Sequence, residues 1–168
     1  GLVGADGETH HGIYDISFMR ILPNIVLMTP SNQNEMWRML NTGLAYNGPS
    51  AVRYPRGNTS GNEIVVTNDT IEIGKSLTIR KGNKIALLVF GELIKNVTDV
   101  AKHLSLTLVD MRFAKPLDIK KIKELAETHQ YFITIEDNVI TGGAGSSVNE
   151  YIHDNGLKVN ILNIGIPD

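Results

Sequence analysis

The chain has 168 residues, of which 42% are hydrophobic and 20% charged, an ordinary globular mixture for one domain or two small ones. The net charge of −2 and the pI near 6.2 give no basic surface for nucleic acid or acidic membranes. The longest apolar run, 85–90, is far too short to span a membrane. Because cysteine is absent, disulfides and thiolate metal sites are excluded.

The two ends indicate a fragment. The chain begins at Gly1 without Met and without a signal-like segment, and it stops at Asp168 directly after an apolar, strand-like run. We therefore expect its function to be that of a longer parent protein. The lack of cysteine fits a reducing cytoplasm.

The first half predicts a strand, a helix and a second strand. Residues 25–28 form a short apolar run that Pro30 ends, and Ser31 can cap the helix that follows. Residues 50–54 read as the next strand. This order is the unit of a parallel sheet. One apolar helix face is predicted from spacings of three and four residues: Met36, Met39, Leu40, Gly43 and Leu44.

A stretch rich in Gly, Asn and Thr, 56–69, reads as a linker. Two strands then follow, 75–80 and 84–90, and the short segment 81–83 between them predicts a β-hairpin.

Helices and strands alternate after this hairpin, and Asp118 can cap one of the helices. Continuous apolar strands are typical of a sheet covered by helices on both faces. We expect a small doubly wound α/β domain whose mixed, mostly parallel sheet contains one antiparallel strand from the hairpin. The predicted helices are 92–103, 118–128 and 145–154, and the predicted strands are 106–110, 131–135 and 159–164.

The segment 4–12 is the first candidate site. It contains three glycines, a carboxylate (Asp6) and two histidines (His10 and His11). Histidine titrates near neutrality and can transfer protons, and Asp6 could orient an imidazole or accept a hydrogen bond from a substrate hydroxyl. The alternative is a surface turn with incidental histidines. A metal site is disfavoured because adjacent histidines diverge and no further ligand cluster lies nearby.

Arg53 and Arg56 lie at the end of the strand 50–54, where ligands of open parallel sheets bind. A guanidinium matches two phosphate oxygens. Residues three apart on a strand point to opposite faces, so one arginine should face a given ligand. The alternative is that both form structural ion pairs.

The glycine-rich segment 142–147 lies between a strand and a helix, where backbone amides can hold a phosphate. The dinucleotide-binding glycine spacing is not met, because Val148 stands where the third glycine belongs. Tight packing is the favoured interpretation of Gly142–Gly145. Glu136 and Asp137, which end the preceding strand, are either catalytic or, as we favour, hydrogen-bonded to amides of this loop.

Several of these segments, in the same order, resemble one family. Residues 4–10 are similar to the G-x-D-G-x-T-H signature of the pyrimidine-binding domain in the transketolase superfamily. The wider pattern resembles its deoxyxylulose-phosphate synthase branch, and it covers essentially the whole chain. Glu8 departs from the expected Pro or Gln at a variable position. The matching segments are 6–12, Asp15, 23–24, 30–31, Glu35, 50–57, 109–113, 115–118, 142–150 and 162–168.

The resemblance implies the condensation of pyruvate with glyceraldehyde 3-phosphate to 1-deoxy-D-xylulose 5-phosphate and CO2, with thiamine diphosphate and Mg2+ as cofactors. The product feeds isoprenoid, thiamine and pyridoxal synthesis. The resemblance further implies a homodimer in the bacterial cytoplasm or in a plastid, without nucleic-acid or membrane partners.

The resemblance also implies site residues. His10 matches the active-site histidine, Asp6 the acidic residue that contacts substrate, and Arg56 the arginine that binds the acceptor phosphate, which leaves Arg53 structural. The domain that holds the diphosphate and magnesium, and the glutamate that activates the cofactor, are not matched. We therefore expect no metal ligand and no assignable cofactor contact here, and the fragment alone should be inactive.

We expect residues 1–62 to be the C-terminal part of a truncated pyrimidine-binding domain, 63–72 a linker, and 73–168 a transketolase C-terminal domain. Two alternatives remain. One is a transketolase or a 2-oxo-acid dehydrogenase subunit, and the other is a non-catalytic module for dimerisation or partner binding.

Overall fold

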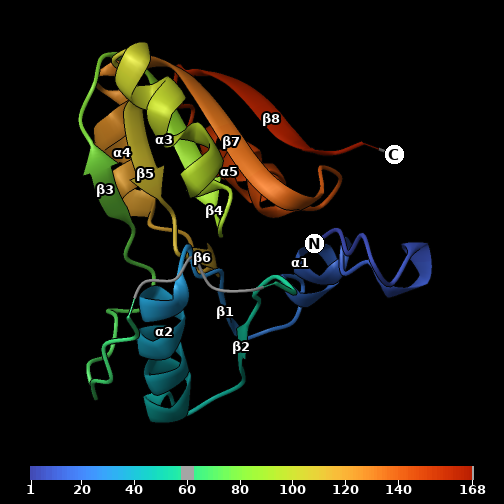
Figure 1. Cartoon of the computed structure of the whole chain (residues 1–168). Helices are drawn as coiled ribbons and strands as arrows, with labels where there is room; N and C mark the ends of the chain where they lie inside the picture. Colours follow the sequence, from blue (N-terminus) through green and yellow to red (C-terminus); the bar gives the residue numbers. More distant parts are fainter. Residues whose placement is uncertain (58–62, 168) are drawn as a thin grey trace.

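The computed structural model of the chain describes residues 1–57 and 63–167. Residues 58–62, which belong to the predicted linker stretch 56–69, lie outside the described residues. A five-stranded sheet with its helices forms one unit, and a three-stranded sheet with α2 forms the other (Figure 1). The chain is therefore an α/β protein built from two unequal units.

The larger sheet is mixed and mostly parallel, as predicted. Its strand order is β3-β5-β4-β7-β8, and only β3 runs antiparallel to its neighbour. Its strands are β3 (Leu77–Arg80), β4 (Lys84–Phe90), β5 (Thr107–Asp110), β7 (His129–Val139) and β8 (Asn160–Ile166), and its helices are α3 (Ile94–His103), α4 (Ile119–Ala126) and α5 (Ala144–Asp154).

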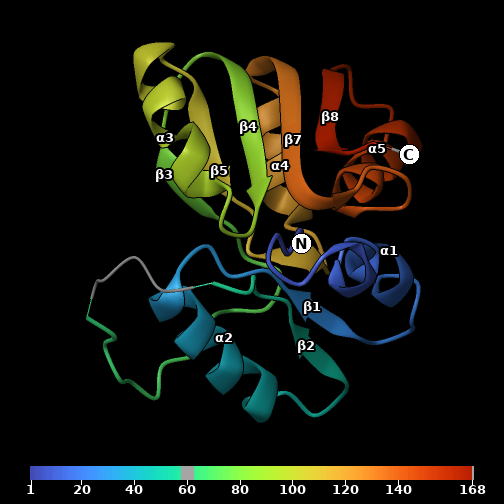
Figure 2. The ribbon, with the colours of Figure 1, turned by 45° about the vertical axis from the view of Figure 1, so that its right-hand side comes forward.

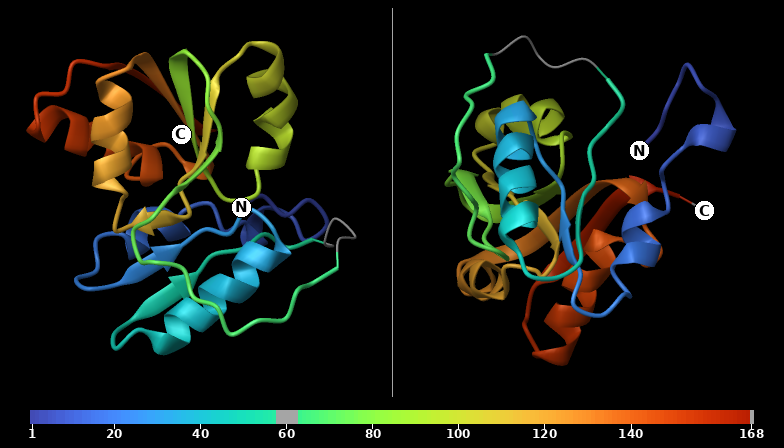
Figure 3. Two further views of the ribbon diagram at one scale, coloured as in Figure 1. Left: turned by 90° about the vertical axis from the view of Figure 1, so that its left-hand side faces the viewer. Right: turned by 90° about the horizontal axis from the view of Figure 1, so that it is seen from below.

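Helices cover both faces of this sheet, which explains the continuous apolar strands. Along β4, Leu88 and Phe90 belong to the core under α4 and α5, whereas Leu87 and Val89 belong to the core under α3. The two helical layers stand on opposite sides of the strands (Figure 3, left). Each burial of this kind contributes about 1.5–3 kcal/mol per large apolar side chain.

The predicted hairpin between 75–80 and 84–90 is wrong. β3 does not pair with β4 but with β5, which lies between them. The connection crosses the start of β5, where the Gly82 amide donates to Thr107 Oγ1 at 2.9 Å and the Asn83 amide donates to the Ser105 carbonyl at 3.0 Å. Three residues are enough to cross β5 and connect β3 to β4, so the short loop did not imply that these two strands pair.

The smaller sheet has the order β2-β1-β6. The parallel pairing of β1 (Val26–Met28) with β2 (Ser50–Val52) across α2 (Gln33–Ala45) confirms the predicted unit. The third strand, β6 (Phe113–Lys115), was not predicted, because three residues before a proline carry no periodic signal. It pairs antiparallel with β1 and so joins the second unit to the first.

Two expectations for α2 require correction. Its cap is Asn32 rather than Ser31, since the Asn32 side chain accepts from the amides of Asn34 and Glu35, both at 3.0 Å. Of the predicted apolar face, Met39 is fully buried, but Leu40 and Leu44 are exposed. The buried positions of α2 are Gln33, Glu35, Met39 and Thr42. The buried face of α2 therefore shares only Met39 with the predicted apolar face, and its other residues are polar.

The segment after the undescribed residues lies along α2. Trp37 Nε1 and Asn41 Nδ2 donate to the Thr67 carbonyl at 2.8 and 2.7 Å, and the Ile71 amide donates to Thr42 Oγ1 at 2.8 Å. Ile71 is buried in the core of the smaller unit. Much of the predicted linker 63–72 is therefore held on the first unit.

The start of the chain lies between the two sheets (Figure 2). There the Val139 amide, at the end of β7, donates to the Ile13 carbonyl at 2.8 Å. Carboxyl ends of parallel strands are the usual ligand edge of a doubly wound sheet, and here that edge faces the first unit. No helix within 1–57 and 63–167 is long and apolar enough to cross a membrane.

Candidate active site

The segment after β2 carries both predicted arginines in different environments. The Arg53 side chain is 9% exposed, whereas that of Arg56 is 66% exposed. The structure therefore gives Arg53 protein partners and leaves Arg56 accessible.

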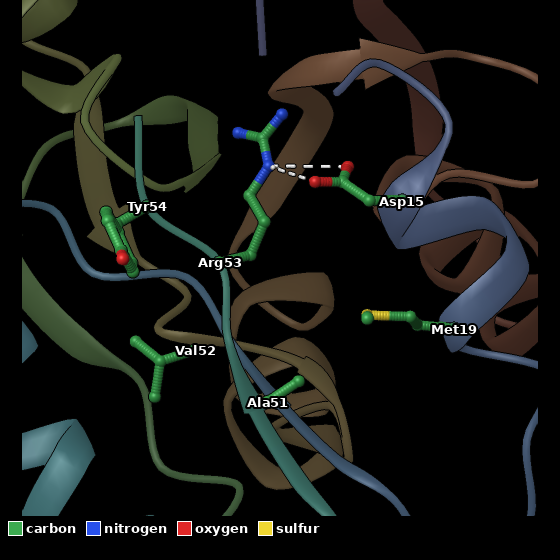
Figure 4. Close-up of a pocket in the computed structure, with 6 residues that line it drawn as sticks. All are labelled: Asp15, Met19, Ala51, Val52, Arg53 and Tyr54. Carbon is green, nitrogen blue, oxygen red and sulfur yellow. Dashed lines mark hydrogen bonds and ion pairs between the residues drawn. The ribbon is translucent and has the colours of Figure 1, made fainter. Parts of the chain in front are cut away.

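The Arg53 guanidinium connects three segments. Its Nε lies 3.1 Å from Asp15 Oδ2 (Figure 4), and its Nη2 donates to the Gly12 carbonyl at 3.0 Å and to the Asp137 carbonyl. These groups belong to the loop before α1 (Asp15–Met19), to α1 itself and to the end of β7. An open pocket of about 220 Å³ borders this cluster, lined by Asp15, Met19, Ala51, Val52, Arg53 and Tyr54.

Residues 4–12, here called the histidine loop, form a compact turn. It contains the short 3-10 helix η1 (Glu8–His10), and the amide of His10 donates to the Gly7 carbonyl at 3.2 Å. Gly7 has φ +76°, a left-handed conformation that favours glycine. The glycine signature therefore reflects a backbone requirement at the entry to η1.

Asp6 and Arg56, predicted from separate segments, form an ion pair in the structure. The Asp6 side chain is 23% exposed. Because Arg56 is largely exposed, the pair contributes little stability. The pair matters for position, because it places the carboxylate and the guanidinium close enough to contact the same ligand.

His10 is exposed on η1, and its Nδ1 lies 3.0 Å from Thr9 Oγ1. It shares the histidine loop with Asp6, although the contact it makes is with its sequence neighbour. An imidazole on an accessible loop can exchange protons with a bound substrate.

Glu136 and Asp137 have different roles at the end of β7. Glu136 is buried and accepts from the amides of Ala144 and Gly145 at 2.8 and 2.7 Å, which confirms the predicted bonding for this residue. Burial raises the pKa of Glu136 to about 7, although these two amides oppose the shift. Asp137 instead contacts Arg53 and the Leu2 amide, so the prediction was wrong for Asp137.

The glycine loop before α5 is closely packed. A Cβ at Gly143 would stand 2.5 Å from Glu136 Oε2, and one at Gly145 would stand 2.2 Å from Asn163 Nδ2. The Glu136 carboxylate already occupies the amides at the start of α5. These contacts support packing, rather than phosphate binding, as the reason for the glycines.

A buried polar cluster joins the units and was not predicted from the sequence. Arg112 Nε lies 2.7 Å from Glu35 Oε2, and both side chains are 10% exposed. The Arg112 amide donates to Asp110 Oδ1 at 3.0 Å, and burial raises the pKa of Asp110 to about 6. The pairing of Glu35 with Arg112 is too distant in sequence for any local pattern to indicate.

A metal site would need a cluster of side chains that could ligate the ion. No group of three or more His, Asp or Glu side chains in 1–57 and 63–167 could hold a metal ion. We therefore assign no residue of this chain to Mg2+ or to the diphosphate that such an ion would accompany.

Two family models account for nearly the whole chain. The transketolase C-terminal domain matches residues 74–168, and the transketolase pyrimidine-binding domain matches residues 1–61. The fold and these matches define the class: the chain belongs to the transketolase family, with part of a pyrimidine-binding domain before the C-terminal domain.

Within this family the chain is homologous to 1-deoxy-D-xylulose-5-phosphate synthases. It is 51% identical to the synthase of Pectobacterium atrosepticum and 54% identical to that of Baumannia cicadellinicola, in both cases over 100% of the chain. The chain spans 27% of the length of these curated relatives.

Solved structures show the same fold at lower identity. A split-gene transketolase, described as an inactive beta4 tetramer, matches 95% of the chain and 54% of its own length, with a TM-score of 0.85 and 24% identity. The transketolase of Campylobacter jejuni matches 96% of the chain and 25% of its own length with a TM-score of 0.63 and 18% identity.

Proposed function

We propose that this chain is part of a thiamine-diphosphate-dependent synthase that condenses pyruvate with glyceraldehyde 3-phosphate to give 1-deoxy-D-xylulose 5-phosphate and CO2. The homology over the whole chain supports this proposal. The structural observation that supports a particular active site is the pairing of Asp6 with Arg56, which brings a carboxylate and a guanidinium together.

We assign three roles. Arg56 binds the acceptor phosphate, because an exposed guanidinium can offer two parallel hydrogen bonds to phosphate oxygens. Asp6 contacts the hydroxyl groups of the substrate. His10 transfers protons near the reacting carbons, for which its exposed imidazole is suited.

The organisation of the parent is also a proposal. Residues 1–62 would complete a pyrimidine-binding domain, 63–72 would form the linker, and 73–168 would be the C-terminal domain of a homodimeric cytoplasmic enzyme. Thiamine diphosphate supplies the electron sink for decarboxylation when it is bound. Because no segment of this chain resembles the domain that holds the diphosphate and magnesium, we expect the isolated chain neither to bind the cofactor tightly nor to consume pyruvate.

A graft tests the proposed function. The matched segment of the Pectobacterium atrosepticum synthase is replaced by this chain, and product formation from pyruvate and glyceraldehyde 3-phosphate is measured. We expect the graft to form 1-deoxy-D-xylulose 5-phosphate. A graft that folds and binds cofactor but forms no product would favour a non-catalytic module.

A further inference from the structure

We propose that Arg53 is a positioning residue that fixes the base of the histidine loop against β7 and thereby sets where Asp6 and His10 stand relative to Arg56. Its consequence for turnover rests on the proposed function, whereas its consequence for the loop does not. The proposal extends the structural role expected from the sequence, since it concerns the placement of one loop rather than general stability.

The geometry of the Arg53 fork carries the proposal. One guanidinium engages the last residue of the loop through the Gly12 carbonyl, α1 through Asp15, and β7 through the Asp137 carbonyl. Its planar array of donors holds these acceptors in a fixed relation, which an ammonium group cannot do. With 9% of the side chain exposed, water competes weakly for these bonds.

The histidine loop depends on its base for its position. Its tip, Gly7 to His10, is exposed to solvent. The base is held by the Arg53 bond to the Gly12 carbonyl, by Gly1, whose amino group donates to the same carbonyl at 2.8 Å and whose carbonyl accepts from the Gly12 amide at 3.0 Å, and by the Val139 amide at the Ile13 carbonyl. Of these contacts, the Arg53 bond is the one that a side chain makes, so it can be removed by substitution. Movement at this base would displace everything that the loop carries.

The charges around Arg53 also support its role in holding the loop base. Asp15 and Asp137 approach the Arg53 guanidinium at 3.1 and 3.9 Å, and their side chains are 24% and 19% exposed. Without Arg53, the Gly1 ammonium, which lies 3.9 Å from Asp137 Oδ2, would remain beside the two partly buried carboxylates and balance their charges only in part, which would favour opening. Arg53 thus joins the acidic ends of α1 and β7.

The spacing from Arg53 to Arg56 connects this anchor to the ligand site. The first arginine holds the base of the histidine loop, and the second pairs with Asp6 within that loop. The same short segment after β2 therefore sets both the support of the loop and the position of the proposed phosphate ligand.

Arg20 provides a matched control. It also joins α1 to the second unit, since Nη1 donates to the Gly142 carbonyl at 3.1 Å and Nη2 pairs with Glu150. It does not touch the histidine loop in these contacts. A variant of Arg20 therefore reports the general cost of losing an arginine between α1 and the second unit.

Hydrogen exchange on the whole chain tests the proposal. In Arg53→Ala, the hydrogen-bonded amides of His10, His11 and Gly12 should exchange about tenfold faster or more, because charged hydrogen bonds are lost. Amides of β4 should be unchanged, and Arg20→Ala should leave the loop amides at wild-type rates. Methylguanidinium, but not methylammonium, should slow exchange in the Arg53→Ala loop.

Arg53→Lys keeps the measurement decisive if Arg53→Ala does not fold. The lysine variant should fold and still show faster loop exchange, because it retains the charge without the fork. Equal acceleration in β4 and in the loop would overturn the proposal and make Arg53 a general stabiliser. Loop amides at wild-type rates in both Arg53 variants would overturn it as well.

The graft gives the kinetic consequence. Arg53→Lys should lower kcat about tenfold or more while leaving the KM for glyceraldehyde 3-phosphate nearly unchanged, since misplacement affects the reacting groups. A rise in that KM alone would overturn the positioning role. If the unsubstituted graft is inactive, the proposed function fails, whereas the exchange results still decide the role of Arg53.

Discussion

Glu35 and Arg112 are 77 residues apart in the sequence, yet their side chains form a 2.7 Å ion pair that joins α2 to the segment after β5. Arg112 also has φ +60°, and its carbonyl accepts from the Thr29 amide at 2.7 Å. The pair therefore stands at the junction of the two units. Removing Arg112 would leave the buried Glu35 carboxylate with the more exposed Arg38, whose Nη1 lies 3.2 Å from Glu35 Oε1, and this partner would compensate its charge only in part.

We predict that Arg112→Met destabilises the chain by about 3–5 kcal/mol, the usual cost of breaking a buried pair. The double variant Glu35→Met, Arg112→Met should recover much of this loss, because neither charge is then left unpaired. Urea unfolding measures both. A double variant as unstable as the single one would show that packing, rather than the unpaired charge, causes the loss.

The buried carboxylate of Glu136, at the start of α5, predicts a pH dependence of stability. The folded-state pKa of Glu136, about 7, is raised above its ordinary value of 4.5. The folded state therefore binds the proton more tightly, so stability falls as pH rises from about 4.5 to 7 and stays lower above pH 7.

Glu136→Gln should remove this part of the pH dependence, which amounts to at most about 3 kcal/mol across the interval. Unfolding by urea at several pH values checks the prediction. Asp110, whose pKa is raised from 3.8 to about 6, contributes a change of the same sign as pH rises across that interval, so Asp110→Asn is the parallel variant. Identical slopes for wild type and Glu136→Gln would contradict the assignment.

The cap of α4 gives a prediction of opposite sign. Asp118 accepts from the Lys121 amide at 3.1 Å and from the Ser76 amide at 2.9 Å. Burial acts to raise its pKa, but these bonds outweigh burial and lower it. Its contribution is therefore present above the unfolded pKa and lost as pH falls through the folded pKa.

Asp118→Ala should cost about 0.5–2 kcal/mol at neutral pH, and Asp118→Asn should cost less because an amide oxygen still caps well. The difference between wild type and Asp118→Ala should shrink in acid. Thermal unfolding at neutral and acidic pH tests this. A pH-independent difference would mean that the carboxylate charge has no part in the cap.

The success of sequence reasoning depended on how local each feature is. Asp118 was correctly predicted to cap its helix, because capping involves residues three apart. The pairing of β3 with β5 was missed, since it depends on which strand fills the centre of a sheet. The glycine loop was interpreted correctly as a packing element, whereas Asp137 was misassigned because its partner, Arg53, comes from the other unit.

At the candidate site, sequence motifs selected Asp6, His10 and Arg56 but could not place them. The ion pair of Asp6 with Arg56 joins the histidine loop to the segment after β2, two segments that are far apart in the sequence. The roles of these residues in the reaction stay predictions.

His10→Ala in the graft should lower turnover by about 10²–10⁴-fold, the usual contribution of a positioned acid–base group. The fold should be unaffected, because His10 is exposed. Steady-state kinetics and circular dichroism measure the two effects. His11→Ala serves as the neighbouring control. An unchanged rate in His10→Ala would favour the alternative interpretation of this segment as a surface turn with incidental histidines.

Arg56→Ala in the graft, measured against each substrate in turn, gives the most direct test of the proposed site. If Arg56 binds the acceptor phosphate, the KM for glyceraldehyde 3-phosphate should rise about ten- to a hundredfold, the equivalent of a lost charged hydrogen bond of about 1.5–3 kcal/mol. The KM for pyruvate, which has no phosphate, should change little, and Arg56→Lys should recover only part of the loss. An equal rise for both substrates, or a selective rise in Arg53→Ala instead, would contradict the assignment of the phosphate to Arg56.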